Sequence, residues 1–204
     1  MDKLRSMEVM VAVVDAGSFA AAASRLQISA VMVGKHIQQL EAHLGARLLQ
    51  RGLPRAVADP ADLSARSDAL LGAFMAGASM AAAGVGIHHQ LCHLLGGAYR
   101  LPHAELHAVV LPHAVHFVTP AARPQLARLA AGLGVTDVAG AIWDLGRRLG
   151  APASLAELGL AEAELDRAAE QAVARVVQTP RRAGVTELRA LLGAAWRGGR
   201  PPPT

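Results

Sequence analysis

The sequence predicts an all-α protein built from two parts. Aromatic residues make up only 3% of the chain, and the alternating β-branched and aromatic runs that strands require are scarce. Apolar residues instead recur at helical spacing, and Pro and Gly separate most of the periodic segments. A length of 204 residues is enough for one medium domain or two small ones.

The first predicted helix covers residues 4–16. Its apolar face is formed by Leu4, Met7, Met10, Val11 and Val14. Gly17 and Ser18 end this helix, and Ser18 is the predicted N-cap of a second helix. The second helix runs from about Phe19 to Leu26. Its small residues Ala21, Ala22 and Ala23 let two helices cross closely, while Leu26 and Ile28 face the inside of the next turn.

A third helix begins after its predicted N-cap Ser29, reaches about Leu44 and stops at Gly45. Four apolar side chains share the face that we expect to be buried: Val33, Ile37, Leu40 and Leu44. The other face carries small residues, a lysine and two amides: Ala30, Val31, Gly34, Lys35, Gln38 and Gln39.

The second and third helices suit the major groove of DNA. Small residues at a helix N-terminus allow close approach, Lys35 can reach a guanine edge or a phosphate, and glutamine can read adenine. Arg47 and Arg51 follow at the place where phosphate contacts would lie. A three-helix packing unit with a solvated basic face is the alternative, and the spacing alone does not separate the two. The net charge of +4 permits an anionic partner without requiring one.

Residues 1–51 resemble the N-terminal winged helix-turn-helix of LysR-type transcriptional regulators. The resemblance rests on "GSFAAAASRLQIS", then Val33, Ile37, Leu40–Glu41, "LG" at 44–45, Leu48 and Arg51. It implies base contacts from the start of the third helix and phosphate contacts from the segment Arg47–Arg51. The DNA-binding residues implied are Ser29, Ala30, Val31, Gly34, Lys35, Gln39, Arg47 and Arg51. After Arg51, "GLPRAVADP" replaces the basic wing and linker helix of that family.

The helical periodicity is interrupted at residues 51–63, "RGLPRAVADPADL", which contain two prolines and no clear periodicity. A domain boundary is therefore expected at residues 51–52. Beyond it, helices are expected near 61–82, 85–98, 103–118, 121–132, 135–149, 161–177 and 186–196. Residues 52–199 would form a helical bundle, and the tail at 200–204 would be disordered.

Residues 69–87 carry no charge and are long enough to span a membrane. Their Ala- and Gly-rich composition favours a closely packed buried helix, so we expect no membrane span. The start of the chain lacks the pattern of a signal peptide. The single cysteine, Cys92, rules out an internal disulfide and fits a reducing compartment. These features predict a cytoplasmic protein.

Seven of the nine histidines lie between His88 and His116. His89 and His93 share a helix face, and His103 follows an "LGG" break and Pro102, a residue that suits the first turn of a helix. Two imidazoles on one helix and a third at a facing helix end can surround a divalent metal. Taken singly, a histidine is more often structural than a ligand, and a structural role is expected for His88, His107, His113 and His116.

Residues from about 52 to 199 resemble the C-terminal helical domain of iron-containing alcohol dehydrogenases. Within that superfamily, they resemble maleylacetate reductases most. The segments that carry the resemblance are "GLPRAVADPADLSARSDALLGAFMAGASM", "GIHHQLCHLLGGAYRLPHAELHAVVLPHA" and "TPRRAGVTELRALLGAAWRG". It implies that His89 and His103 are ligands of iron or zinc and that His93 contacts substrate or relays a proton as the catalytic residue. Thr119 stands where that family usually has Asn.

Two parts of that enzyme family are missing from the sequence. Its other metal ligands come from an Asp-x-x-x-His pair, which no aspartate of residues 52–199 forms, and its N-terminal nucleotide-binding domain has no counterpart. The metal site would then be incomplete, and NAD(P)H is not expected to bind.

The two resemblances lead to one main functional hypothesis and several alternatives. The main hypothesis is a transcriptional regulator that binds double-stranded DNA through residues 1–51, with the helical part pairing two copies as a homodimer and inactive as an enzyme alone. The runner-up is an NAD(P)H-dependent maleylacetate reductase of aromatic degradation. A non-catalytic metal- or partner-binding module and a remnant without selected function are the remaining readings.

Overall fold

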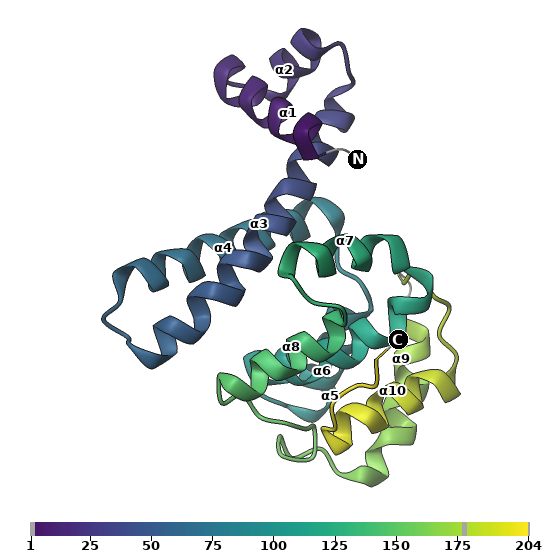
Figure 1. The fold of residues 1–204 in the computed structure, drawn as a ribbon. Helices are drawn as coiled ribbons and strands as arrows, with labels where there is room; N and C mark the ends of the chain where they lie inside the picture. Colours follow the sequence, from purple (N-terminus) through teal and green to yellow (C-terminus); the bar gives the residue numbers. More distant parts are fainter. Residues whose placement is uncertain (1–2, 177–178, 204) are drawn as a thin grey trace. The chain divides into compact units, whose positions relative to one another are not determined.

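The computed structural model describes the backbone of residues 3–176 and 179–203. The side chains of residues 3, 4, 14, 37–44, 78, 82 and 83 lie outside the described part. Every regular element formed by the described residues is a helix, which confirms the predicted all-α class (Figure 1). The chain divides into two compact units, Met1–Gly84 and Val85–Thr204, each described below by itself.

Residues 3–84, the described part of the first unit, form four helices: α1 (Lys3–Ala16), α2 (Phe19–Leu26), α3 (Ala30–Ala58) and α4 (Leu63–Ala83). The predicted caps of α2 and α3 are confirmed, because Ser18 Oγ accepts a hydrogen bond from the Ala21 amide and Ser29 Oγ accepts one from the Met32 amide. Leu26 and Ile28 pack against the small core of this unit, as expected for residues inside the turn.

The buried face of α1 agrees with the predicted one only in part, because Met10 packs against the core, whereas Leu4 and Val14 lie outside the described side chains. Val9 and Ala12 are buried, whereas Met7 and Val11 are more than half exposed. Apolar residues surround much of α1, so the periodicity in its sequence identifies no single face. Val9 and Ala12 pack with Val33 of α3, which confirms the predicted burial of Val33; Ile37, Leu40 and Leu44 lie outside the described side chains.

The helix α3 does not stop at Gly45 but continues through Gly45, Gly52 and Pro54 to Ala58. A Cβ atom on Gly52 would lie 2.9 Å from the Ala65 carbonyl oxygen, and one on Gly72 would lie 2.9 Å from the Gly45 carbonyl oxygen. These glycines therefore let α3 and α4 pack closely, and this packing overrides their weak helix propensity. The predicted boundary at residues 51–52 falls inside this helix, where the described residues form no wing.

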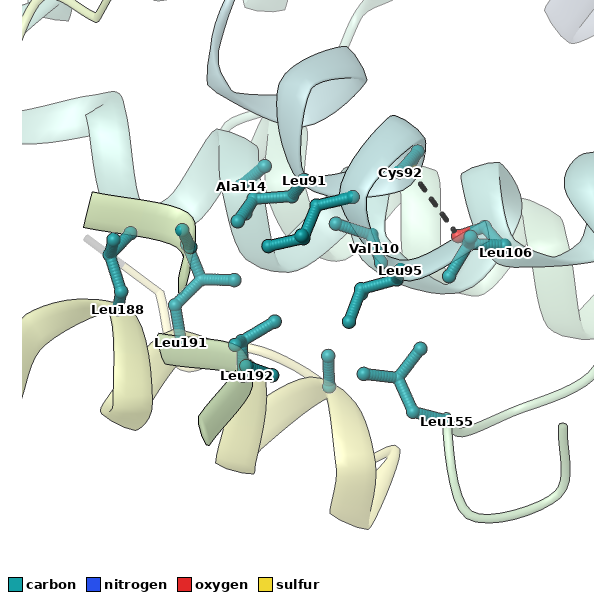
Figure 2. Packing of buried hydrophobic residues seen from close by; sticks show 14 of the residues in the cluster. Leu91, Cys92, Leu95, Leu106, Val110, Ala114, Leu155, Leu188, Leu191 and Leu192 are labelled. Atoms are coloured by element: carbon teal, nitrogen blue, oxygen red, sulfur yellow. Dashed lines mark hydrogen bonds between the residues drawn. The ribbon is translucent and has the colours of Figure 1, made fainter. Parts of the chain in front are cut away.

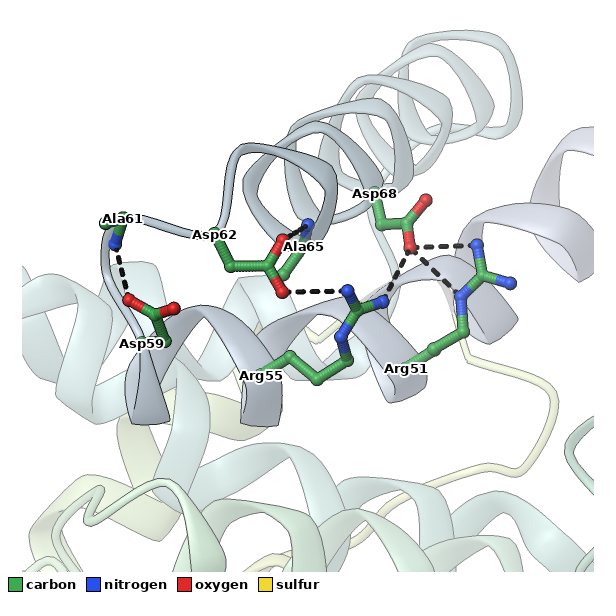
Figure 3. A network of polar contacts seen from close by, with 7 residues as sticks. All are labelled: Arg51, Arg55, Asp59, Ala61, Asp62, Ala65 and Asp68. Atoms are coloured by element: carbon green, nitrogen blue, oxygen red, sulfur yellow. Dashed lines mark hydrogen bonds and ion pairs between the residues drawn. The ribbon is translucent and has the colours of Figure 1, made fainter.

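Charged side chains join α3 to α4 near the turn between them (Figure 3). Arg51 Nη2 lies 2.8 Å from Asp68 Oδ2, and Arg55 Nη2 lies 2.7 Å from Asp62 Oδ2. The other carboxylate oxygen of Asp62 caps α4 by accepting a hydrogen bond from the Ala65 amide. Because both arginines are largely exposed, each ion pair contributes roughly 0–1 kcal/mol.

The described residues of the second unit form six α-helices and two short 3-10 helices. They are α5 (Ile87–Tyr99), α6 (His103–Val118), η1 (Thr119–Ala121), α7 (Arg123–Leu133), α8 (Val138–Arg148), η2 (Glu162–Glu164), α9 (Leu165–Arg175) and α10 (Val185–Arg197). Leucines from α5, α6 and α10 and from the loop at Leu155 meet in one core (Figure 2). The Cys92 thiol is buried in this core and donates to the Leu106 carbonyl oxygen at 3.9 Å.

The end of the chain is held by side-chain contacts. Arg200 Nε lies 3.0 Å from Asp144 Oδ1, Arg200 Nη1 lies 3.2 Å from Asp137 Oδ2, and Pro201 is buried. The described residues 200–203 therefore differ from the disordered tail expected at 200–204. No single helix among the described residues is long and apolar enough to cross a membrane.

Candidate metal centre

Five histidines gather where α5 packs against α6. His88, His89 and His93 belong to α5, and His103 and His107 belong to α6. Arg100 adopts a left-handed backbone conformation that ends α5, and Pro102 immediately precedes α6. This short connection brings the histidine-bearing ends of the two helices together.

The ring of His107 lies in the middle of the group. Its centroid is 4.7 Å from that of His88, 4.9 Å from that of His89 and 4.3 Å from that of His103. One ligand nitrogen from each of His88, His89 and His107 lies within 4.8 Å of the other two. Among the described residues, this is the group of three or more His, Cys, Asp or Glu side chains that could hold one metal ion.

The hydrogen bonds of the cluster leave nitrogen lone pairs available. His88 Nε2 lies 3.1 Å from the His107 carbonyl oxygen, which can only accept, so Nε2 carries the hydrogen and Nδ1 has the lone pair. A histidine ligand commonly donates its other ring N–H to a carbonyl in this way. His107 Nε2 is buried and has no hydrogen-bond partner among the described residues. A buried polar atom without a partner is unusual, so this nitrogen is suited to bind a metal ion.

Burial favours the neutral form of three of these histidines, His88, His89 and His107. Burial first, and the neighbouring imidazoles after it, lower the pKa of His88 and of His107 to about 4 in each case. The pKa of His89 is also lowered, first by burial and then by His93 and His103. Neutral imidazole is the form that binds metals, so these three side chains are ready to coordinate at neutral pH.

The structure brings together some of the predicted site residues and adds others. His89 belongs to the three-histidine group, whereas the predicted ligand His103 adjoins it through His107. The ring of His93 is 6.4 Å from the rings of His89 and His103, and this side chain is exposed. His88 and His107 were expected to be structural. The four-residue spacing between His103 and His107, which places both on one helix face, was the signal for His107.

The residues predicted to bind DNA lie along α3 and at its N-cap. Ser29 caps the helix, and Ala30, Val31, Lys35 and Arg47 are exposed. Gly34 is half-buried, and the side chain of Gln39 lies outside the described residues. Arg51, predicted to bind phosphate, is engaged by Asp68 (Figure 3).

The helical fold and the histidine cluster define a class of protein, and comparison with known proteins identifies it. The profile of the Fe-containing alcohol dehydrogenase family, C-terminal, matches residues 31–196. The chain therefore belongs to this family. The predicted resemblance of its larger part is confirmed, and the match extends beyond the expected start at residue 52 to the beginning of α3.

Maleylacetate reductases are prominent among the similar proteins. The enzyme of Burkholderia cepacia is 44% identical over 168 residues, which are 82% of this chain and 48% of that protein. The crystal structure of maleylacetate reductase from Rhizobium sp. superposes with a TM-score of 0.77 at 44% identity, covering 81% of this chain and 47% of the other. A structure of 1,3-propanediol oxidoreductase has a TM-score of 0.73 at 28% identity, covering 78% of this chain and 45% of the other. The chain thus spans about half the length of these relatives.

The hypothesis of a transcriptional regulator with double-stranded DNA as partner is wrong. The family match begins at residue 31 and so includes most of the helix predicted to read DNA, and the similar proteins are metabolic enzymes. The resemblance of residues 1–51 to LysR-type regulators finds no support in these comparisons. The resemblance rested on the spacing of small and apolar residues, and any closely packed helix pair requires similar spacing.

The family name implies iron, and the donor set of the cluster fits a divalent transition metal. Imidazole nitrogens suit Fe, Zn, Cu and Ni alike. The unpartnered Nε2 of His107 and the lone pair on His88 Nδ1 are observations of this structure that agree with a bound ion.

Proposed function

We propose that this chain is the helical, metal-binding half of a maleylacetate reductase-type oxidoreductase that uses NAD(P)H. The observation that carries the proposal is the group of neutral imidazoles from His88, His89 and His107, in a chain 44% identical to a maleylacetate reductase. A divalent metal held there would act as a Lewis acid on a substrate carbonyl, and the nicotinamide cofactor would supply the hydride.

His89 is the central residue of this proposal. It belongs to the three-histidine group of the structure and is also one of the two ligands implied by the family resemblance. Either His103, the second ligand implied by the resemblance, or His107, a member of the three-histidine group, would bind the metal beside His89. Their ring centroids are 4.3 Å apart. His93 lies beside both His89 and His103 and is exposed, so it is placed to contact a substrate or pass a proton to it.

Turnover requires a bound nicotinamide, and the matched region is the C-terminal part of the family. We therefore expect this chain alone to give no NADH oxidation with maleylacetate. Activity should require a nucleotide-binding domain. In a test, this domain is supplied by the half of the Rhizobium enzyme that the present chain does not match. This expectation keeps metal binding and turnover as two separate readouts.

Metal binding is the first test. The full chain, stripped with a chelator, is titrated with Co²⁺ and followed by its visible absorption bands. We expect one ion per chain, and the His89→Ala variant should lose the bands. The exposed Lys35→Ala variant is the control and should bind as the wild type does. A wild-type chain that binds no metal, or a His89→Ala variant that binds it equally well, would contradict the proposal.

Turnover is the second test. NADH oxidation should appear when the nucleotide-binding half is added together with maleylacetate, and His93→Ala should lower it at least tenfold without loss of the cobalt bands. Unchanged turnover in His93→Ala would remove the proposed role of this residue while leaving the metal site in place.

A further inference from the structure

A cavity lies in the Val85–Thr204 unit, and none of the five clustered histidines lines it. Its volume is about 470 Å³, and its walls come from the end of α6, from α10 and from residues 199–202. His107 and His116 are nine residues apart along α6, which corresponds to roughly 14 Å along the helix axis. A volume of this size lies within the range of pockets for small molecules, roughly 300–1,000 Å³.

Two histidines of this cavity have ring nitrogens without partners. His113 is only 4% exposed, and its Nε2 has no hydrogen-bond partner among the described residues. His116 also lines the cavity, and its buried Nδ1 is unpartnered in the same sense. Because leaving a buried polar atom unpaired is costly, these atoms favour a polar ligand in the cavity.

Three arginines line the cavity, but only one is not committed to a carboxylate. Arg181 is paired with Glu187 at 3.1 Å and lies over the ring of Phe117, and Arg200 is paired with Asp137 and Asp144. No carboxylate of the described residues forms an ion pair with Arg197. Arg197 and His113 both line the cavity. The lowered pKa of His113, about 4, is caused first by burial and then by the charges of His116 and Arg197. The cavity therefore has one uncompensated positive charge beside two hydrogen-bonding imidazoles.

The rest of the lining is largely apolar. Phe117, Pro120, Leu191 and Pro201 contribute to the wall, and the acid among the lining residues, Glu187, is already bound by Arg181 and by the Gly184 amide. A single arginine and imidazole N–H donors suit one carboxylate, which arginine binds with matching planar geometry. A phosphate dianion would need a second uncompensated charge, and it would leave the apolar wall unused.

We infer that this cavity binds a small organic carboxylate, with its carboxylate against Arg197, His113 and His116 and its apolar body against Phe117 and Leu191. The site is independent of the metal centre and of the proposed reductase activity, because none of its residues belongs to the five-histidine cluster. It assigns a ligand class to the part of the second unit that the proposed function does not use.

Isothermal titration calorimetry of the full chain tests this site with three probes: benzoate, the neutral benzamide of the same shape, and inorganic phosphate. We expect saturable benzoate binding at least tenfold tighter than that of benzamide or phosphate. Arg197→Gln should weaken benzoate binding at least tenfold, and His113→Asn should weaken it severalfold. Arg128→Gln is the matched control, because it removes an exposed arginine from α7 outside the cavity and should leave benzoate binding unchanged.

Several results would overturn the inference. No detectable benzoate binding would do so, as would equal binding of benzamide, which would mark the cavity as merely apolar. Equal binding of phosphate would mark a general cationic surface. Unchanged benzoate affinity in Arg197→Gln would place the ligand elsewhere. Circular dichroism of each variant and its Co²⁺ titration show that the fold and the metal centre are intact, so that failure of this site is distinct from failure of the proposed function.

Discussion

The Nε2 atom of His88 on α5 lies 3.1 Å from the backbone carbonyl oxygen of His107 on α6. This hydrogen bond fixes the tautomer of His88 and joins the two helices that supply the histidine cluster. It also brings the two imidazole rings to a centroid distance of 4.7 Å, although the residues are nineteen positions apart in the sequence. Two histidines expected to be structural therefore become candidates for metal binding.

The identity of the ligands can be read from paired substitutions. His107→Ala should weaken Co²⁺ binding by at least tenfold, because it removes one nitrogen of the three-histidine group. His103→Ala should have a smaller effect, since its ring adjoins the group only through His107. Cobalt absorption titrations of the two variants provide the measurement. A larger loss in His103→Ala would instead favour the ligand pair implied by the family resemblance.

Stability should fall when the pH is lowered from about 6.5 to about 4. Burial lowers the pKa of His88, His107 and His113 from 6.5 to about 4 in the folded chain. Between these values the unfolded chain binds more protons than the folded chain, so the free energy of unfolding decreases as the pH falls. Urea unfolding followed by circular dichroism at several pH values measures this. His113→Gln should flatten the decrease, and an unchanged free energy of unfolding across this window would contradict the prediction.

Gly52→Ala should destabilise the first unit by about 1–3 kcal/mol, because the added Cβ would lie 2.9 Å from the backbone of α4. Gly77→Ala, in α4, is the matched control, since a Cβ there meets nothing within 4 Å. That variant should be stabilised by up to about 1 kcal/mol, the difference in helix propensity. Thermal unfolding compares the two variants. Equal melting temperatures would mean that α3 and α4 do not pack this closely.

Cys92 should be inert in the folded chain. Its side chain is fully buried in the core of the second unit, and burial raises the pKa of its thiol to about 12. Labelling by a chromogenic disulfide reagent should be at least ~100-fold slower in buffer than in denaturant, because the thiolate is the reactive form. Rapid labelling of the native chain, with circular dichroism unchanged, would show that α5 and α6 open around this residue.

Much of the helical organisation could be predicted from local patterns. Ser18 and Ser29 were identified as N-caps because a cap needs only a side-chain oxygen near the first free amides of its own helix. Most helices of the second unit were likewise expected within a few residues of their ends, since Gly, Pro and Asp residues act on the chain beside them. The larger family resemblance rested on the long segment around His89 and His103, and the comparisons confirm it.

The remaining errors arose where distant residues decide the outcome. From its neighbours alone, Gly45 was predicted to end the helix, but packing against α4 stabilises α3 beyond this residue. Arg51 was predicted to bind phosphate, but its Nη2 atom lies 2.8 Å from Oδ2 of Asp68 on α4. A short sequence pattern contains no information about such partners, and the pattern of residues 1–51 therefore suggested a DNA-binding function that the comparisons contradict.

By itself, the sequence determined the all-α class, the caps and the concentration of seven histidines in one segment, because each depends on residue type and near-neighbour spacing. Only the tertiary structure decided which imidazoles meet, since His88 and His107 approach through the packing of α5 on α6. It likewise decided that His113 and Arg197 line one cavity, because α6 and α10 are brought together only when the apolar core between them is buried.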